Sequence, residues 1–395
     1  MHDSEPSECE PGVTSNNQFD VIVLGLGAMG AATLDALATR GIRALGIERF
    51  GIPHEHGSSG GDTRLIRMAY YEHPDYVPLL RGAYEFWEGL EARTNEKVLF
   101  RTGIAQIGRA DGEALAGARH AAALHGLRFE SVAPDDAAKR WPTLRVPDGY
   151  EAAWDSDGGF LLAAKSIRLF AECALRASAT VRAGERVIGW RELGDGVEVH
   201  TTNQRYRAAR LVVTAGSWTS PLMPSLGIPL EVTRQPLFWT WPADPDMFSI
   251  QRHPCWFAEL DGHAGQFYGF PMLGAADSVQ LGFKIAHHVA GRATDPDHVD
   301  AGDVDEFEPI RDALGQVFRV PLGDVVAVKV CRYTSTTDQH FIVDHYPGSQ
   351  RVVVACGFSG HGFKFASVMG EILADLAVDG ATKWPIEFLK LQRFR

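Results

Sequence analysis

Two arginines stand where a charged side chain could bind an anion. Arg64 and Arg67 follow a loop, residues 49–63, that is too rich in glycine and proline for a helix or strand. We expect them to begin a turn or helix, on which residues three apart share one face. Two solvated surface charges are the alternative. The glycine-rich approach favours a ligand site, because loops at the carboxyl ends of parallel strands face the ligand.

Two lysines are also candidates. Lys284 lies in the alternating run 280–288, where an extended chain places Gly282, Ala286 and His288 on its side. A lysine in such a setting needs a partner, and we leave open a functional lysine and an edge-strand lysine. Lys364 follows a glycine-rich turn that enters a predicted helix, 366–378. Free N–H groups at a helix start bind anions or polarised oxygens.

The opening of the chain predicts a dinucleotide site. An apolar run, 21–24, leads into Gly25, Gly27 and Gly30 in G-x-G-x-x-G spacing, then into a helix-like segment, and a second apolar run ends at Glu48. The first glycine permits the turn, the second the approach of the pyrophosphate, and the third close helix–strand packing. An acid at the end of the second strand can bind the ribose. The glycines alone do not say which dinucleotide.

Two further stretches belong to the same pattern. An apolar strand predicted at 209–214 ends in the small residues TAGS, as is needed where backbone passes close to a nucleotide. Residues 228–290 hold short strand-like runs with many aromatic rings between prolines. They predict an antiparallel sheet with one aromatic face, which is either core alone or a sheet that closes over a cofactor.

Composition limits the class of protein. The chain has 395 residues, which suggests two or three domains. A net charge of −12 argues against nucleic acid or an anionic membrane as partner. Five scattered cysteines with no C-x-x-C pair predict neither a disulfide framework nor a metal site. Residues 1–18 are polar, without the features of a signal peptide, and predict a disordered tail and a cytoplasmic protein.

Taken together, six motifs resemble one known family in order and spacing. They are GLGAMG, GSSGGDTRLIR, TAGSW, FYGFP with GFKIAHH, CRYTSTTDQHFIVD and GFSGHGFKFAS. The chain resembles the monomeric sarcosine oxidase and N-methyl-L-tryptophan oxidase family, within the D-amino-acid-oxidase-like FAD amine oxidases. The resemblance covers residues 19–378 and implies an α/β protein. A Rossmann-like FAD-binding domain would comprise 19–93, 160–235 and 331–395, and an α+β substrate domain with an antiparallel sheet would comprise 94–159 and 236–330.

The same resemblance implies residue roles. Arg67 and Lys364 would bind a substrate carboxylate, with Tyr333 and Phe257 beside the substrate. Lys284 would promote reaction with O₂, Arg64 would support the flavin, and His288 and Tyr268 would position the amine. Cys331 would carry FAD in a thioether link. The residues implied to contact the cofactor are Gly25, Gly27, Ala28, Met29, Gly30, Glu48, Arg49, Ser58, Thr63, Arg64, Gly216, Trp218, Cys331, Gly357, Gly360, Gly362 and Lys364.

The resemblance implies an FAD-dependent oxidase of a secondary amino acid that forms an imine and H₂O₂, acting as a monomer. Two positions depart from the pattern: Gly60 stands where a histidine is common, and Phe257 where a smaller or more flexible side chain aligns. The substrate, which could also be a cyclic or glycated amino acid, therefore stays open. An amine dehydrogenase with another electron acceptor, an NAD(P)H-using monooxygenase and a non-catalytic flavoprotein are the remaining alternatives.

Overall fold

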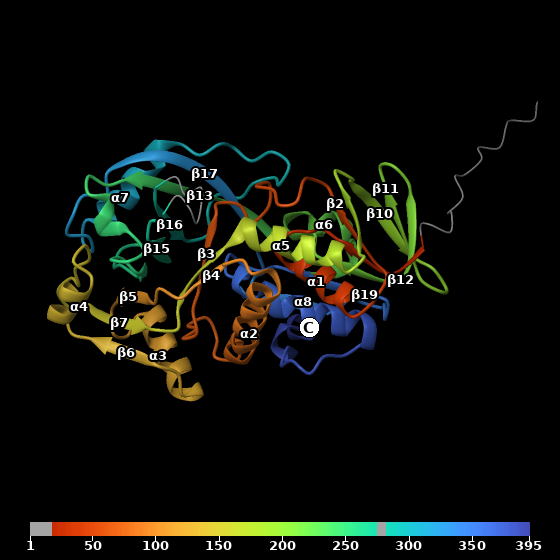
Figure 1. The fold of residues 1–395 in the computed structure, drawn as a ribbon, viewed down its shortest axis with the longest axis horizontal. Coiled ribbons are helices and arrows are strands. Elements are labelled where there is room, and N and C mark those ends of the chain that lie inside the picture. The colour runs from red at the N-terminus through yellow and green to blue at the C-terminus, as the bar shows by residue number, and fades with distance from the viewer. Residues whose placement is uncertain (1–17, 275–281) are drawn as a thin grey trace, which may run out of the picture.

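The computed structural model describes residues 18–274 and 282–395. Within them the chain forms two eight-stranded sheets and one three-stranded sheet. The large sheets stand side by side along the long axis of the molecule, with strands of the small sheet between them (Figure 1). The predicted tail lies outside the described residues except for Gln18, which begins the first strand.

The first sheet has a parallel centre, as the opening of the chain predicts. β1 (Gln18–Leu24) pairs in parallel with β2 (Ala44–Glu48) and with β12 (Arg205–Val213). The sheet is completed by β9 (Thr180–Ala183), β10 (Val187–Glu192), β11 (Val197–Thr201), β18 (Ile342–His345) and β19 (Val352–Cys356).

Three helices pack together beside this sheet: α1 (Ala28–Thr39), α5 (Ala163–Arg176) and α8 (Ala366–Asp379). Their buried residues are mostly alanine, leucine and other apolar types. Helix α8 approaches α1 so closely that a Cβ on Gly370 would lie 2.7 Å from the Ala32 backbone. This packing holds the start of α1, which follows the G-x-G-x-x-G turn, in a fixed place.

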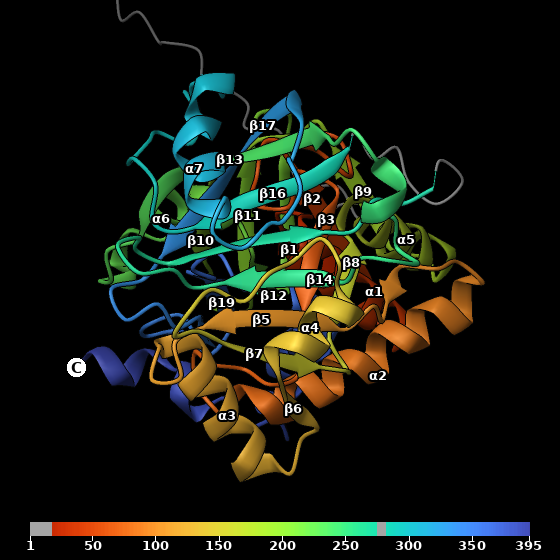
Figure 2. The same cartoon turned by 90° about the vertical axis from the view of Figure 1, so that its left-hand side faces the viewer.

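The second sheet is the predicted aromatic one, and Figure 2 looks onto it. Its order is β17-β13-β16-β15-β14-β5-β7-β6, with all neighbours antiparallel except the parallel pair β14 and β5. The bounds are β5 (Ile104–Gly108), β6 (Phe129–Val132), β7 (Glu151–Asp155), β13 (Glu231–Trp241), β14 (Cys255–Ala258), β15 (Gln266–Phe270), β16 (Phe283–His288) and β17 (Asp324–Ser335). The remaining helices are α2 (Tyr76–Thr94), α3 (Glu113–His125), α4 (Pro134–Arg140), α6 (Thr219–Leu222) and α7 (Glu308–Leu314).

The strands of this sheet can be compared with the predictions for Lys284 and for the domain boundaries. The edge-strand alternative for Lys284 is wrong, because β16 lies between β13 and β15. Gln280 and Leu281, the start of the predicted alternating run, lie outside the described residues. Two predicted domain boundaries, after residue 235 and before residue 331, fall inside β13 and β17. The division into domains stays a prediction.

The expectation of a turn or helix at Arg64–Arg67 is wrong. Residues Thr63–Ile66 form strand β3, which pairs with β8 (Gly159–Leu162), and β8 pairs with β4 (Leu99–Phe100). The cause is tertiary, because the partner strand β8 is distant in the sequence. Arg64 lies in β3 and lines both cavities described below, whereas Arg67 follows the strand and lines only the smaller one.

Strand register gathers several predicted residues on one face of the second sheet. Phe257 pairs with Tyr268, Tyr268 with Ala286, and Ala286 with Leu237. Residues paired across neighbouring strands point to the same face, and so do residues two apart. The same face thus carries Lys284 and His288.

Candidate active site

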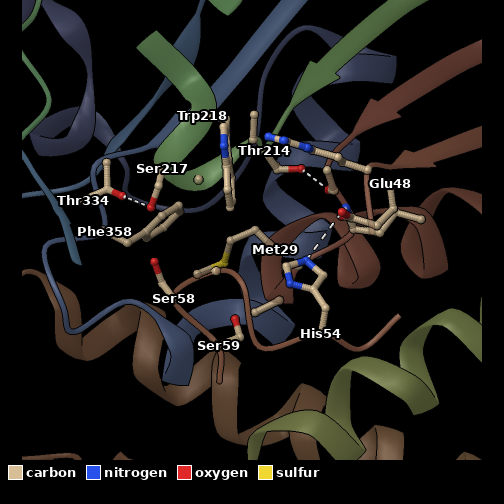
Figure 3. A pocket seen from close by; sticks show the side chains of 18 of the residues that line it. Met29, Glu48, His54, Ser58, Ser59, Thr214, Ser217, Trp218, Thr334 and Phe358 are labelled. Carbon is tan, nitrogen blue, oxygen red and sulfur yellow. Dashed lines mark hydrogen bonds and ion pairs between the residues drawn. The ribbon is translucent and has the colours of Figure 1, made fainter. Parts of the chain in front are cut away.

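A large cavity lies between the start of α1, the loop after β2 and the ends of β12, β17 and β19. It has about 330 Å³ of free volume. Met29 and His54 border it on one side and Ser217, Thr334 and Phe358 on the other (Figure 3). All three predicted strand–glycine–helix units contribute to its lining, with residues of 25–29, 214–218 and 357–363.

The three opening glycines have the spatial roles that a dinucleotide requires. Gly25 has φ +83°, and a Cβ there would lie 2.6 Å from the Thr214 carbonyl oxygen. A Cβ on Gly30 would lie 1.8 Å from the Gly25 carbonyl oxygen, so helix and turn are in contact. Gly27 lines the cavity, and a Cβ there would meet nothing within 4 Å. An anion can therefore approach the N–H groups at the start of α1. The residues fit a pyrophosphate.

Glu48 is held as a buried carboxylate beside this turn. Its oxygens accept hydrogen bonds from the N–H groups of Leu26 (2.8 Å) and Phe50 (2.9 Å), and His54 Nε2 lies 3.5 Å away. Burial alone would raise the pKa of Glu48, but His54 and the Phe50 N–H lower it below the ordinary value. The acid is thus ionised and ready to accept hydrogen bonds from ribose hydroxyls.

Sequence reasoning missed a contact that joins two residues of the cavity lining, Arg49 and Trp218. Asp297, in the segment after β16, accepts hydrogen bonds from Arg49 Nη1 (2.6 Å) and Trp218 Nε1 (2.7 Å). The hydrogen bond from Trp218, and to a smaller extent that from Arg49, holds the pKa of Asp297 below its ordinary value. The segment after β16 is thereby tied to the residues that follow β2 and β12 of the first sheet.

Cys331 and Arg64 lie at the inner end. The Cys331 thiol lines the cavity, donates to the Ser58 carbonyl oxygen at 3.2 Å, and lies 3.4 Å from Arg64 Nη2. Arg64 also donates to the carbonyl oxygens of Ser58 (2.8 Å) and Gly60 (2.5 Å). Cys331 and Arg64 are thus both held against the backbone of the loop after β2.

A second, small cavity of about 40 Å³ adjoins the first. Its lining includes Arg67, Glu72, Phe257, His288 and Lys364. The two cavities share a wall, made by Arg64, Tyr268, Tyr333, Gly360 and Phe363. A small molecule in the second cavity would therefore lie beside the inner end of whatever fills the first.

Two cations and one carboxylate face this small cavity. Arg67 Nη2 binds both oxygens of Glu72 at 2.5 Å. Burial opposes the charge on Glu72, but Arg67 most of all lowers the pKa of the carboxyl to about 2. Arg67 Nε is buried and has no acceptor among the described residues. The cluster thus has one unused guanidinium donor and one positive charge more than negative charges when Lys364 is protonated.

Lys364 is held by uncharged oxygens. Its Nζ donates to the His361 carbonyl oxygen at 2.6 Å and lies 3.4 Å from the Tyr70 hydroxyl, which is 2.6 Å from His361 Nδ1. Burial, and then the charge of Arg67, lowers the pKa of Lys364 to about 7. Burial also lowers the pKa of His361 to about 3. Near neutral pH the histidine is neutral and the lysine titrates.

The opposite side of the small cavity is aromatic and uncharged. His288 Nδ1 lies 3.0 Å from the Tyr333 hydroxyl, and burial lowers the pKa of His288 to about 4. Tyr268 and Phe257 complete this side. Such a surface suits the apolar, neutral part of an amine better than its charged form.

Lys284 lines neither cavity. Its buried Nζ donates to the carbonyl oxygens of Gly61 and Thr63 (2.8 Å for Thr63) and lies between the rings of Trp239 and Phe270. Burial first, and then the charge of Arg64, lowers its pKa well below the ordinary value. The amine therefore lies behind the backbone of residues 61–63, which separates it from the cavities.

Most of the predicted cofactor-contact residues line the large cavity. The exceptions are Gly30, which packs behind the turn, Thr63, which holds Lys284, and Lys364, which lines the small cavity. The roles assigned to all of these residues stay predictions. Sequence reasoning missed Glu72, Tyr70, His361 and Asp297. A signal existed only for His361, which lies inside the motif GFSGHGFK.

Comparison with known proteins decides the family. The family described as FAD dependent oxidoreductase matches residues 20–376. The chain belongs to this FAD-dependent oxidoreductase family. It is 36% identical to a monomeric sarcosine oxidase of Streptomyces avermitilis over 371 residues, 93% of this chain and 96% of that protein. It is 33% identical to an N-methyl-L-tryptophan oxidase of Escherichia coli O9:H4, covering 96% of this chain and all of that protein.

A solved structure supports the same fold. NikD, described as an unusual amino acid oxidase essential for nikkomycin biosynthesis, matches in its open form with a TM-score of 0.82 and 25% identity, covering 95% of this chain and 97% of that chain. The resemblance deduced from the motifs is thus confirmed, as are the α/β fold, FAD dependence and oxidoreductase class. In residues 18–274 and 282–395, no helix is long and apolar enough to cross a bilayer, and no His, Cys, Asp or Glu cluster could hold a metal ion.

The glycine geometry predicts opposite defects for two matched substitutions. Gly27→Ala should reduce the amount of bound FAD, because the methyl group enters the cavity. When samples of equal flavin content are compared, its thermal unfolding temperature should stay close to that of the wild-type chain. Gly30→Ala should lower the unfolding temperature, because the methyl group overlaps backbone, and overpacking of this kind costs about 1–3 kcal/mol. Flavin absorbance per chain and thermal unfolding measure the two effects. A Gly30→Ala protein as stable as wild type contradicts the assignment.

Lys364 predicts the pH dependence of carboxylate binding. It is protonated below its pKa of about 7 and neutral above it, so affinity for acetate should fall as pH rises through 7. Above this pKa the fall in affinity approaches about tenfold per pH unit, because acetate binds the protonated form of the lysine in preference to the neutral form. Flavin absorbance titrations with acetate from pH 6 to 8.5 measure it, with Lys364→Met as the control that should show a flat profile. Equal slopes in both proteins would remove Lys364 from the carboxylate site.

Proposed function

We propose that the protein is an FAD-dependent oxidase of a secondary amino acid, a sarcosine-like or other N-methyl amino acid, which converts substrate and O₂ into an imine and H₂O₂. One observation carries the proposal. Arg67, with an unpartnered buried Nε, lines with Lys364 a small cavity that shares a wall with the large one. A guanidinium is well suited to a carboxylate. The names of the relatives, sarcosine and N-methyl-L-tryptophan oxidase, support an N-methyl amino acid.

The residues of the chain would bind and orient the substrate. Arg67 and Lys364 would hold its carboxylate, and Tyr268, Tyr333 and neutral His288 would border its amine. Bound FAD supplies the two-electron acceptor. The FAD itself would be held by the glycine turn, Glu48 and the backbone of 357–362 at the start of a helix. The name of the relatives also supports a monomer, and we propose a cytoplasmic enzyme.

A panel of amines tests the function. The flavin-loaded protein is incubated with N-methylglycine, other N-methyl amino acids, cyclic and glycated amino acids and, for comparison, primary amino acids. Peroxide and oxygen uptake are measured. The proposal expects peroxide in step with oxygen from at least one secondary amino acid, and loss of most kcat/KM in Arg67→Met. Peroxide from primary amino acids alone, or from none of the panel, would contradict it.

An amine dehydrogenase is the second candidate, because Lys284 lines neither cavity and its Nζ is bound to backbone carbonyls. The oxidase hypothesis needs this cation to stabilise superoxide as it forms. Lys284→Met should then slow reoxidation of the reduced protein by O₂ at least about a hundredfold, which is the size of a lost electrostatic contact in a dry site. Stopped-flow reoxidation measures this rate. Unchanged reoxidation would favour the dehydrogenase.

The position of Cys331 supports a covalent link to FAD. Its sulfur lines the cavity beside Arg64. Acid-precipitated wild-type protein should be yellow, and Cys331→Ser should give a colourless pellet and a yellow supernatant, because an alcohol is not a comparable nucleophile. A Cys331→Ser pellet that stays yellow would place the link elsewhere. A colourless wild-type pellet would contradict covalent attachment.

A further inference from the structure

The small cavity has one wall that limits its size. At about 40 Å³ it has room for about three water molecules, since each needs roughly 10–15 Å³ when volume is counted in this way. Several residues of its lining have other roles. Arg67 and Lys364 supply charge, and Tyr268 and Tyr333 separate the small cavity from the large one. Among the uncharged residues that line only the small cavity, His288 and His361 are hydrogen-bonded, Leu65 is smaller, and Phe257 contributes a large apolar ring.

The backbone of Phe257 is fixed. It lies in β14, in the interior of the second sheet, paired on one side with Tyr268 and on the other with Gln106. The side chain is 4% exposed. A ring on an interior strand cannot withdraw by moving its backbone, so any extra space must come from rotation of the ring.

Tyr71 opposes that rotation. Its ring centroid lies 5.7 Å from that of Phe257, and its hydroxyl donates to Gln266 Oε1 at 3.0 Å. Gln266 is buried on β15, two residues from Tyr268 on the same face. On its other side Tyr71 packs with apolar residues of α3, where a Cβ on Gly117 would lie 2.7 Å from the Tyr71 carbonyl oxygen. The tyrosine is therefore tied to both the sheet and a helix.

The guanidinium of Arg67 completes the packing. Its central carbon lies 4.7 Å from the Tyr71 ring centroid and 5.4 Å from that of Phe257. Movement of either ring would disturb the group that is proposed to bind the carboxylate, and contacts between a buried cation and aromatic rings are favourable. The Arg67 charge, the Tyr71 ring and its hydrogen bond to Gln266 thus hold the Phe257 ring in one position.

We propose that Phe257, braced by the positioning residue Tyr71, restricts the substrate to secondary amino acids without a bulky side chain, of the N-methylglycine class. This inference rests on the proposed function and specifies its substrate. The Cα of a carboxylate held by Arg67 and Lys364 has no room for a large substituent while the Phe257 ring is present. An aromatic amino acid would need the space that the ring fills.

Selective opening of the wall tests the proposal. Binding of acetate and of indole-3-acetate to the flavin-loaded protein is followed by flavin absorbance, and kcat/KM is measured for N-methylglycine and N-methyl-L-tryptophan. Wild type should favour the small member of each pair. Phe257→Leu should shift both ratios toward the large member by at least about tenfold, the usual effect of a changed pocket contact. Tyr71→Phe, which loses only the tie to Gln266, should shift them in the same direction by less.

Phe267→Leu is the matched control. Phe267 is equally buried in β15 but points to the opposite face, where it stacks on His287. It should leave both ratios unchanged. A wild type that prefers the large members, or a Phe257→Leu protein with unchanged ratios and a normal flavin spectrum, would overturn the size limit while the proposed function stands. Failure of wild type to bind either carboxylate and to oxidise any secondary amino acid would instead refute the function on which the inference rests.

Discussion

An excess of buried positive charge organises the candidate active site. Arg67 and Lys364 face one small cavity with a single carboxylate, Glu72, and burial of unbalanced charge is costly. Part of the cost is relieved by the low pKa of Lys364, and part by the aromatic rings around Arg67. A ligand carboxylate would remove the imbalance. The charge imbalance would therefore contribute to affinity for an amino acid.

The arrangement of the sheets makes this site possible. One sheet supplies the glycine turn and Glu48, and one face of the other supplies Phe257, Tyr268 and His288. β17 joins them, because its residues Cys331 and Tyr333 lie on the wall of the large cavity. Each sheet has its own hydrophobic core. Rigid cores on both sides allow a charged cavity at the junction without general loss of stability.

Local patterns predicted the first sheet well. The spacing of Gly25, Gly27 and Gly30 and the position of Glu48 depend on short-range steric rules: Gly25 and Gly30 are in close backbone contact, and Gly27 lines the open cavity. The prediction of a turn or helix at Arg64–Arg67 was wrong because β8, a distant strand, pairs with residues Thr63–Ile66. Family resemblance identified most of the residues that line the small cavity.

Long-range partners could not be found in this way. Glu72 follows Arg67 by five residues. Ion pairs can be predicted from spacings of three or four residues in a helix, but this segment is not helical and the spacing is different. Asp297 reaches Arg49 across 248 residues. The prediction for Lys284 gave its strand and face, but its bonds to the backbone of Gly61 and Thr63 depend on how the small sheet packs on the second sheet. Tertiary packing decides such contacts.

A crystal structure of the flavin-loaded protein with bound acetate would show directly whether Arg67 and Lys364 form a carboxylate site. We expect the carboxylate between Arg67 Nε and Lys364 Nζ, within hydrogen-bond distance of both and beside the flavin. A carboxylate bound elsewhere, with Arg67 Nε still unpartnered, would contradict it.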